Sequence, residues 1–196
     1  MSKAVDFYFD VGSPASYLAA TQLPRLCKEA GAQLNYKPML LGGVFQATGN
    51  ASPAAIPAKG RYTFDDLARH ADRYGVRFHR NPHFPINTLM LMRGAVGMQR
   101  DRPEHFVAYL DAVFNAIWID GENMNDAMVV ARTLEAAGLA ADRVMALVND
   151  STVKEALKQN TTEAVARGVF GAPTMFVGSE MFFGQDRLEF VRQALE

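Results

Sequence analysis

The chain has 196 residues, of which 49% are apolar, and its 20 basic and 21 acidic residues leave a formal net charge of -1. This length and apolar content suffice for one compact domain, and balanced charge without a run of Lys or Arg argues against a dedicated nucleic-acid surface. No apolar stretch has the length of a signal peptide or a membrane span, so we expect a cytoplasmic protein with no membrane partner.

The first residues predict a β-α-β unit. Apolar and polar side chains alternate over residues 4–10, which predicts a half-buried strand. Ser13 is a natural N-cap and Pro14 fits the first position of a helix, which Pro24 should kink or end. A second strand is expected over residues 32–40, most simply parallel to the first.

The middle of the chain changes from a predicted loop to predicted helices. Residues 43–61 are dense in Gly, Ala and Pro and carry few charges, which predicts a long ordered loop. Apolar residues then recur at helical spacing for about a hundred residues. Helices are expected to begin near Thr63, Asn87, Pro103, Asp126 and Ser151, the last two ending at Gly138 and Gly168.

Two strands are expected near the C-terminus, at residues 174–177 and 180–183. Gly178-Ser179 between them suits a tight hairpin, and a last helix should start near Asp186. This order matches the two halves of a thioredoxin fold around a helical insert. We therefore predict an α/β, thioredoxin-like fold in which residues 1–60 and 169–196 form the two halves and residues 61–168 form an all-helical insertion.

Cysteine and histidine content limits the chemistry. Cys27 is the only cysteine, which excludes an internal disulfide and a cysteine-based zinc site. The four histidines lack a metal-ligand spacing, so no metal is expected. Cys27 falls more than three turns into the first predicted helix, where we expect it to pack in the core; a nucleophilic role is the alternative.

Ser13 and Ser16 occupy the spacing at which a redox protein of this fold places Cys-x-x-Cys. A serine hydroxyl does not ionise near neutral pH, but it can donate a hydrogen bond to a thiolate. Lowering a thiol pKa from about 8.5 to about 6.5 takes roughly 2.7 kcal/mol. A helix N-terminus supplies about 0.3–1 kcal/mol and a hydrogen bond to a charged group about 1.5–3 kcal/mol. Both meet at Ser13, for which a plain N-cap is the alternative interpretation.

Four stretches, FYFDVGSPASYL, ATGNASPAAIPAKGRY, FGAPT and FGQDRLEFV, resemble the kappa-class glutathione transferases and, more closely, the bacterial 2-hydroxychromene-2-carboxylate isomerases. The resemblance covers nearly the whole chain. It implies a DsbA-like fold, glutathione as cofactor, a small aromatic substrate and a homodimer. The implied reaction converts 2-hydroxychromene-2-carboxylate to trans-o-hydroxybenzylidenepyruvate in aromatic-hydrocarbon catabolism, by addition and loss of the glutathione thiolate.

The resemblance also implies the site. Its glutathione-facing serine falls on Ser13 and its cis-proline on Pro173, where the Ala172 backbone would pair with glutathione. The other implied glutathione-binding residues are Pro14, Asn50, Pro57, Lys59, Asp186 and Arg187, with Asp186 on the γ-glutamyl ammonium.

Phe45 and Trp118 are candidates for an aromatic wall against a planar substrate, with core packing as the alternative for Trp118. Pro173 as a turn proline, and Lys59, Asp186 and Arg187 as solvated residues, are also alternatives. Two other functions stay open: a general kappa-class transferase or peroxidase, and a non-catalytic protein that binds glutathione or a peptide.

Overall fold

A four-stranded sheet with strand order β2-β1-β3-β4 lies at the centre of the computed structural model, which describes residues 3–196. β1 (Ala4–Phe9) pairs in parallel with β2 (Gln33–Pro38). On its other side β1 pairs antiparallel with β3 (Thr174–Val177), which pairs antiparallel with β4 (Glu180–Phe183). The predicted β-α-β and β-β-α halves, including the parallel first pair and the hairpin, are confirmed.

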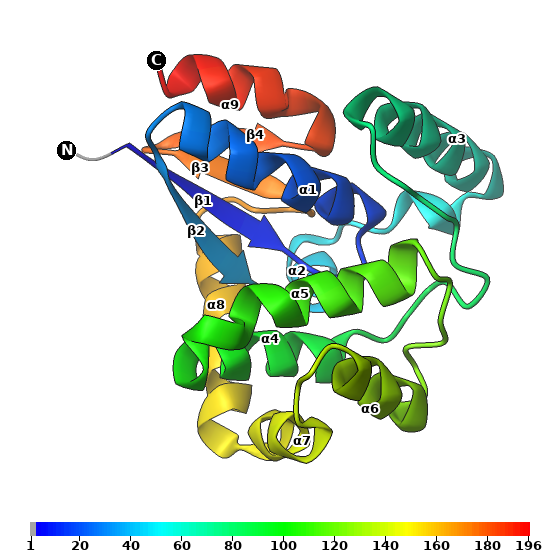
Figure 1. Cartoon of the computed structure of the whole chain (residues 1–196). Coiled ribbons are helices and arrows are strands. Elements are labelled where there is room, and N and C mark those ends of the chain that lie inside the picture. The colour runs from blue at the N-terminus through cyan, green and yellow to red at the C-terminus, as the bar shows by residue number, and fades with distance from the viewer. Residues whose placement is uncertain (1–2) are drawn as a thin grey trace.

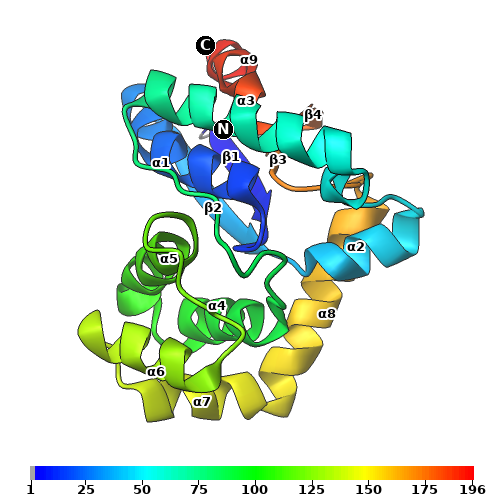
Figure 2. The same ribbon diagram turned by 90° about the vertical axis from the view of Figure 1, so that its right-hand side faces the viewer.

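Helices cover both faces of the sheet (Figure 1). α1 (Pro14–Glu29) and α9 (Leu188–Ala194) lie on one face, whereas α2 (Leu41–Thr48) and α8 (Ser151–Ala166) pack on the other. Figure 2 shows the remaining insertion helices grouped below the sheet and α3 alongside α1. The other elements are η1 (Pro53–Ala55), α3 (Pro57–Tyr74), α4 (Leu89–Asp101), α5 (Pro103–Trp118), α6 (Ala127–Ala136), α7 (Ala141–Asn149) and η2 (Gln185–Arg187).

β1 is buried on both faces towards its C-terminal end, where the half-buried prediction is wrong. Tyr8 and Asp10, on the face predicted to be polar, are each 1% exposed. α2 and α8 cover this face and supply polar partners: the Tyr8 hydroxyl donates to Glu163 at 3.1 Å and accepts from Arg167 at 3.1 Å. Alternation in the sequence cannot report a second covering layer, because that layer comes from distant segments.

Residues 43–61 are largely helical, so the predicted long loop is wrong. α2 has no side-chain cap from its own N-terminal residue, and the Asp10 carboxylate instead accepts the Leu41 N–H at 2.8 Å. A cap supplied by a distant residue leaves no local sequence signal. α3 begins at Pro57 instead of near Thr63, so the expected division between residues 60 and 61 falls inside a helix.

Two other helical features differ from the prediction. α1 does not end at Pro24 but continues to Glu29, with Leu23 and Leu26 buried on either side of the proline, and a kink at Pro24 stays a prediction. The short helix α7 was not predicted; it begins without a side-chain cap. It packs closely on α4, where a Cβ at Gly97 would lie 2.7 Å from Leu147 Cβ.

The C-terminal stops that we predicted at Gly138 and Gly168 are confirmed by φ values of 74° and 91°. These left-handed values favour glycine over a residue with a Cβ.

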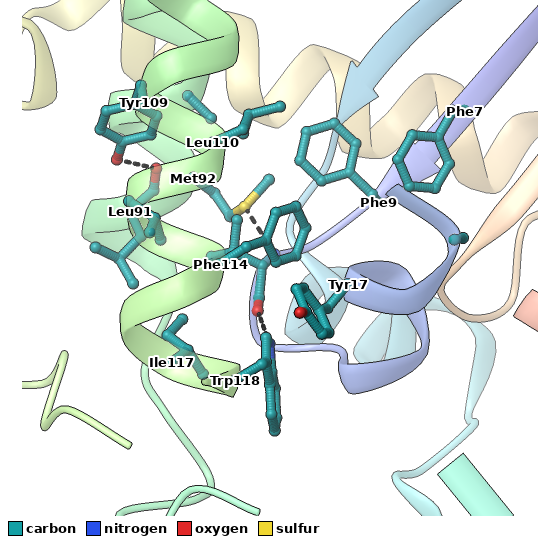
Figure 3. Packing of buried hydrophobic residues seen from close by; sticks show 14 of the residues in the cluster. Phe7, Phe9, Tyr17, Leu91, Met92, Tyr109, Leu110, Phe114, Ile117 and Trp118 are labelled. Carbon is teal, nitrogen blue, oxygen red and sulfur yellow. Dashed lines mark hydrogen bonds between the residues drawn. The ribbon is translucent and has the colours of Figure 1, made fainter. Parts of the chain in front are cut away.

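The helical insertion and the sheet share one core (Figure 3). The Phe114 ring of α5 lies 6.2 Å from Phe9 of β1 and 5.9 Å from Tyr17 of α1, centroid to centroid. The Tyr109 hydroxyl donates to the Leu91 carbonyl at 2.7 Å and so joins α5 to α4. The insertion therefore supports the carboxyl end of β1 directly.

Within residues 3–196, no helix combines the length and the apolar character needed to cross a membrane.

Candidate active site

A cavity of about 770 Å³ opens where the carboxyl end of β1 meets the N-terminus of α1. This volume falls within the roughly 300–1,000 Å³ of typical small-molecule sites. Seven of the predicted site residues line it: Ser13, Pro14, Phe45, Asn50, Ala172, Asp186 and Arg187. Segments far apart in the sequence therefore meet at one place, as the predicted thioredoxin-type site requires.

Ser13 is the N-cap of α1, as predicted. Its Oγ accepts the Ser16 N–H at 3.1 Å and donates to the Ala172 carbonyl at 3.0 Å, and the residue is only 4% exposed. The hydroxyl therefore joins the start of α1 to the segment that precedes β3.

The first turn of α1 offers one open backbone donor. Pro14 has no N–H, and the N–H groups of Ser16 and Tyr17 already donate to Ser13. In the described part of the chain the Ala15 N–H has no such partner, and Ala15 lines the cavity. The first turn of α1 therefore presents one N–H, that of Ala15, beside the Ser13 hydroxyl.

The Ala172–Pro173 peptide bond is cis, as predicted. Pro173 is buried, and its carbonyl accepts the Gly184 N–H at 3.0 Å. A second cis bond, Phe84–Pro85, lies on the cavity wall and was not anticipated.

Asn50 connects two sides of the cavity. Its Nδ2 donates to the Phe170 carbonyl at 2.8 Å, and its Oδ1 accepts the Ala51 N–H at 2.8 Å. The side chain therefore holds the end of α2 against the segment before Ala172.

Asp186 and Arg187 form an ion pair at 2.6 Å at the edge of the cavity. Their side chains are 38% and 48% exposed, so both charges are accessible to a ligand. Pro57 and Lys59 lie in the first turn of α3, exposed and outside the lining residues of the cavity. Their contact with glutathione stays a prediction.

Trp118 is 0% exposed and does not line the cavity. Its Nε1 donates to the Val11 carbonyl at 2.8 Å, so the indole supports the turn before Ser13 from below (Figure 3). The prediction of Trp118 as a substrate wall is wrong, and core packing is confirmed. Phe45 lines the cavity, and its contact with a substrate stays a prediction.

Cys27 is 2% exposed, which confirms core packing. Burial raises the pKa of its thiol to about 11. A protonated, inaccessible thiol cannot serve as the nucleophile.

Sequence reasoning missed much of the apolar wall. Phe64 of α3 and Phe84 before α4 lie 5.4 Å apart, centroid to centroid, and Phe170 packs on Phe183 at 4.6 Å; all four line the cavity. The apolar FPI run at residues 84–86 was an available signal, although helical periodicity on both sides obscured it.

Asp10 and Thr88 were also missed. Strand alternation placed Asp10 on a solvent face, but its carboxylate is buried and accepts the Gly12 N–H at 2.9 Å and the Thr88 hydroxyl at 3.0 Å. Burial raises the pKa of Asp10, and hydrogen bonds from Leu41, Gly12 and Thr88 oppose that rise.

The chain matches the family model described as a DSBA-like thioredoxin domain over residues 4–196. It is 32% identical to the 2-hydroxychromene-2-carboxylate isomerase of Sphingobium xenophagum, with 100% of this chain and 99% of that protein covered. The isomerase of Pseudomonas putida is 34% identical, with 97% and 93% covered. The kappa 1 glutathione S-transferase of Rattus norvegicus is 26% identical, with 98% and 91% covered.

Solved structures give the same relationship. A 2-hydroxychromene-2-carboxylate isomerase superposes with a TM-score of 0.86 at 32% identity, over 98% of this chain and 94% of that chain. The cytosolic disulfide reductase DsbM of Pseudomonas aeruginosa has a TM-score of 0.65 at 15% identity, with 98% of each chain covered. The second likeness concerns the fold alone.

Proposed function

Since the chain belongs to the DSBA-like thioredoxin family, we propose that it is a glutathione-dependent isomerase. Its relatives in this family are 2-hydroxychromene-2-carboxylate isomerases and kappa-class glutathione transferases. Both groups of relatives are enzymes. The proposed reaction converts 2-hydroxychromene-2-carboxylate to trans-o-hydroxybenzylidenepyruvate. The observation that carries it is Ser13, a buried hydroxyl at a helix N-terminus, in place of a redox cysteine, beside a largely apolar cavity.

The groups around the cavity fit glutathione. Ser13 and the Ala15 N–H present two donors where the sulfur would lie, and the Ala172 backbone is beside them. Asp186 and Arg187 offer opposite charges for the γ-glutamyl ammonium and a carboxylate. We assign Pro14 and Asn50 to the same site, with Pro57 and Lys59 as outer contacts.

When bound, glutathione supplies a thiolate that adds to a conjugated carbon and later leaves it, without net oxidation. Ser13 stabilises that anion. In the structure the Ser13 hydroxyl donates to the neutral Ala172 carbonyl, and a hydrogen bond of this kind contributes about 0.5–1.5 kcal/mol. A hydrogen bond to a charged acceptor contributes about 1.5–3 kcal/mol. The hydroxyl proton therefore favours the sulfur, and the Ser16 N–H keeps Oγ in place during this exchange.

The apolar wall suits a planar aromatic substrate. Phe45, Phe64 and Phe84 approach the cavity from three separate segments. Flat rings bury large areas against aromatic side chains, and the same wall excludes water from the developing charge.

We also propose a cytoplasmic homodimer. A buried, reduced cysteine and a dependence on a glutathione thiol suit a reducing compartment. The dimer rests on the family resemblance.

The test is turnover of 2-hydroxychromene-2-carboxylate, followed by ultraviolet absorbance with and without glutathione. We expect conversion that requires glutathione and saturates with it. Equal conversion without glutathione would contradict the proposal. Rapid conjugation of an aryl halide or reduction of a hydroperoxide, with no isomerisation, would indicate a general kappa-class activity instead, and binding without turnover would indicate a binding protein.

A further inference from the structure

Asp10 is a buried carboxylate at the cavity that the chemistry above does not use. It is 1% exposed and lines the cavity beside Ser13. Oδ1 accepts the Gly12 N–H at 2.9 Å, and Oδ2 accepts the Leu41 N–H at 2.8 Å and the Thr88 hydroxyl at 3.0 Å. One carboxylate thus receives donors from three separate segments.

Each of these segments carries a different part of the site. Gly12 directly precedes Ser13, and Leu41 opens α2, which carries Phe45. Thr88 ends the segment that carries Phe84 and Ile86. The turn and this segment are also in close contact, because a Cβ at Gly12 would lie 2.6 Å from Thr88 Cγ2.

We propose that Asp10 is a positioning residue, which fixes Ser13 relative to the two walls that hold the substrate. The two oxygens of Asp10 accept three hydrogen bonds, from two backbone N–H groups and one hydroxyl that face them. Loss of one acceptor leaves a part-buried N–H or the buried Thr88 hydroxyl unpaired, which is relieved by movement of the segment that carries it. The kinetic test of this role rests on the proposed function.

Two substitutions at Thr88 separate its hydrogen bond from its packing. Thr88→Val keeps the shape but removes the donor to Asp10, whereas Thr88→Ser keeps the donor and removes the methyl group beside Gly12. We expect Thr88→Val to lower kcat about tenfold, with KM for glutathione changed less than about threefold, because small displacements of reacting groups cost rate. Thr88→Ser should stay within about threefold of the wild type in kcat.

The matched control is Thr21→Val. The Thr21 hydroxyl donates within its own helix, to the Leu18 carbonyl at 2.7 Å, away from the cavity. We expect this variant to keep the wild-type kcat, measured well below the unfolding midpoint of every variant. Equal losses in Thr88→Val and Thr88→Ser would assign the effect to packing and overturn the proposal, as would a wild-type kcat in Thr88→Val.

Asp10→Asn tests the role without any ligand. Its amide nitrogen must face either the Gly12 or the Leu41 N–H, so one of these donors loses its acceptor. We expect hydrogen exchange at one or both amides to accelerate at least about tenfold, without a matching acceleration across β1. Unchanged exchange at both amides overturns the proposal. If the wild type lacks turnover, the proposed function fails, and this measurement still decides the role of Asp10.

Discussion

The two sides of the cavity are held in different ways. The turn at residues 10–13 is fixed by distant groups: the Val11 N–H donates to Met92 Sδ at 3.3 Å, and the Val11 carbonyl accepts Trp118 Nε1 at 2.8 Å. Residues 49–58 opposite are mostly exposed. Among described residues, the Asn50 contact with Phe170 is their one side-chain hydrogen bond to a distant segment.

In the proposed function, the firmly held turn carries the group that takes part in the reaction, and the exposed side contacts the ligands. A group that stabilises developing charge needs a fixed position before the reaction, and the core gives Ser13 the fixed position that its proposed role requires. A wall that meets the substrate tolerates exchange of side chains, because exposed segments contribute little to stability. Substitutions that remove support from the turn should therefore cost far more than those on the exposed wall.

Removal of the Trp118 indole is expected to have the largest effect. Trp118→Ala leaves a cavity beneath the turn and an unpaired Val11 carbonyl, so we expect a loss of about 3–5 kcal/mol in the free energy of unfolding. Tyr62→Ala in α3, which also lines the cavity and is 64% exposed, should change it by less than about 0.5 kcal/mol. Urea unfolding measures both, and similar losses would remove the contrast.

Ser13→Ala should leave the fold intact and weaken the bound thiolate. Loss of a charge-assisted hydrogen bond of about 1.5–3 kcal/mol raises the pKa of the bound thiol by about one to two units. The rate at saturating substrate should then rise with pH through a higher value than in the wild type. Ultraviolet titration of the enzyme–glutathione complex measures this pKa; identical curves would make Ser13 only a helix cap.

Cys27, which is buried in the core, makes the free energy of unfolding depend on pH. Its folded pKa of about 11 exceeds the ordinary value of 9.0, so the folded state holds the proton more tightly. This stabilisation is complete below pH 9 and is lost as the pH rises to about 11, by roughly 2–3 kcal/mol. Between pH 9 and pH 11, the free energy of unfolding should therefore decrease less in Cys27→Ala than in the wild type. The cavity that this substitution creates lowers the free energy of unfolding equally at the two pH values. Equal decreases would contradict the expectation.

Asn50→Ala should loosen residues 49–58 without affecting the turn at residues 10–13. It removes the hydrogen bond to the Phe170 carbonyl, and we expect glutathione affinity to fall by about 1 kcal/mol, roughly fivefold. The pKa of the bound thiol should stay as in the wild type. Calorimetric binding and thiolate titration separate the two quantities, and a shift in the pKa would mean that the two sides are coupled.

Ser16→Ala should have the smallest effect. The Ser16 Oγ is buried and has no hydrogen-bond partner among the described residues. Removal of an unpaired polar atom should leave the free energy of unfolding unchanged or raise it by up to about 1 kcal/mol. A loss of stability on thermal or urea unfolding would reveal a partner for this hydroxyl.

The sequence by itself determined the elements whose signals are local. Alternation, the Ser13-Pro14 start of α1, the Gly178-Ser179 hairpin and the glycine stops each depend on a few neighbouring residues. Their order was enough for a thioredoxin fold with a helical insertion. Motif resemblance then identified six residues that line the cavity, and Phe45 was a separate aromatic candidate that also lines it.

Only the tertiary structure decided features that depend on distant partners. α2 takes its cap from Asp10, α7 depends on its contact with α4, and the second face of β1 is covered by α8. The indole of Trp118 packs in the core, and its buried N–H is satisfied by the Val11 carbonyl, a partner 107 positions away in the chain. Hydrogen bonds and packing between remote segments leave no periodic or compositional trace near either partner, so these features become visible only after the chain has folded.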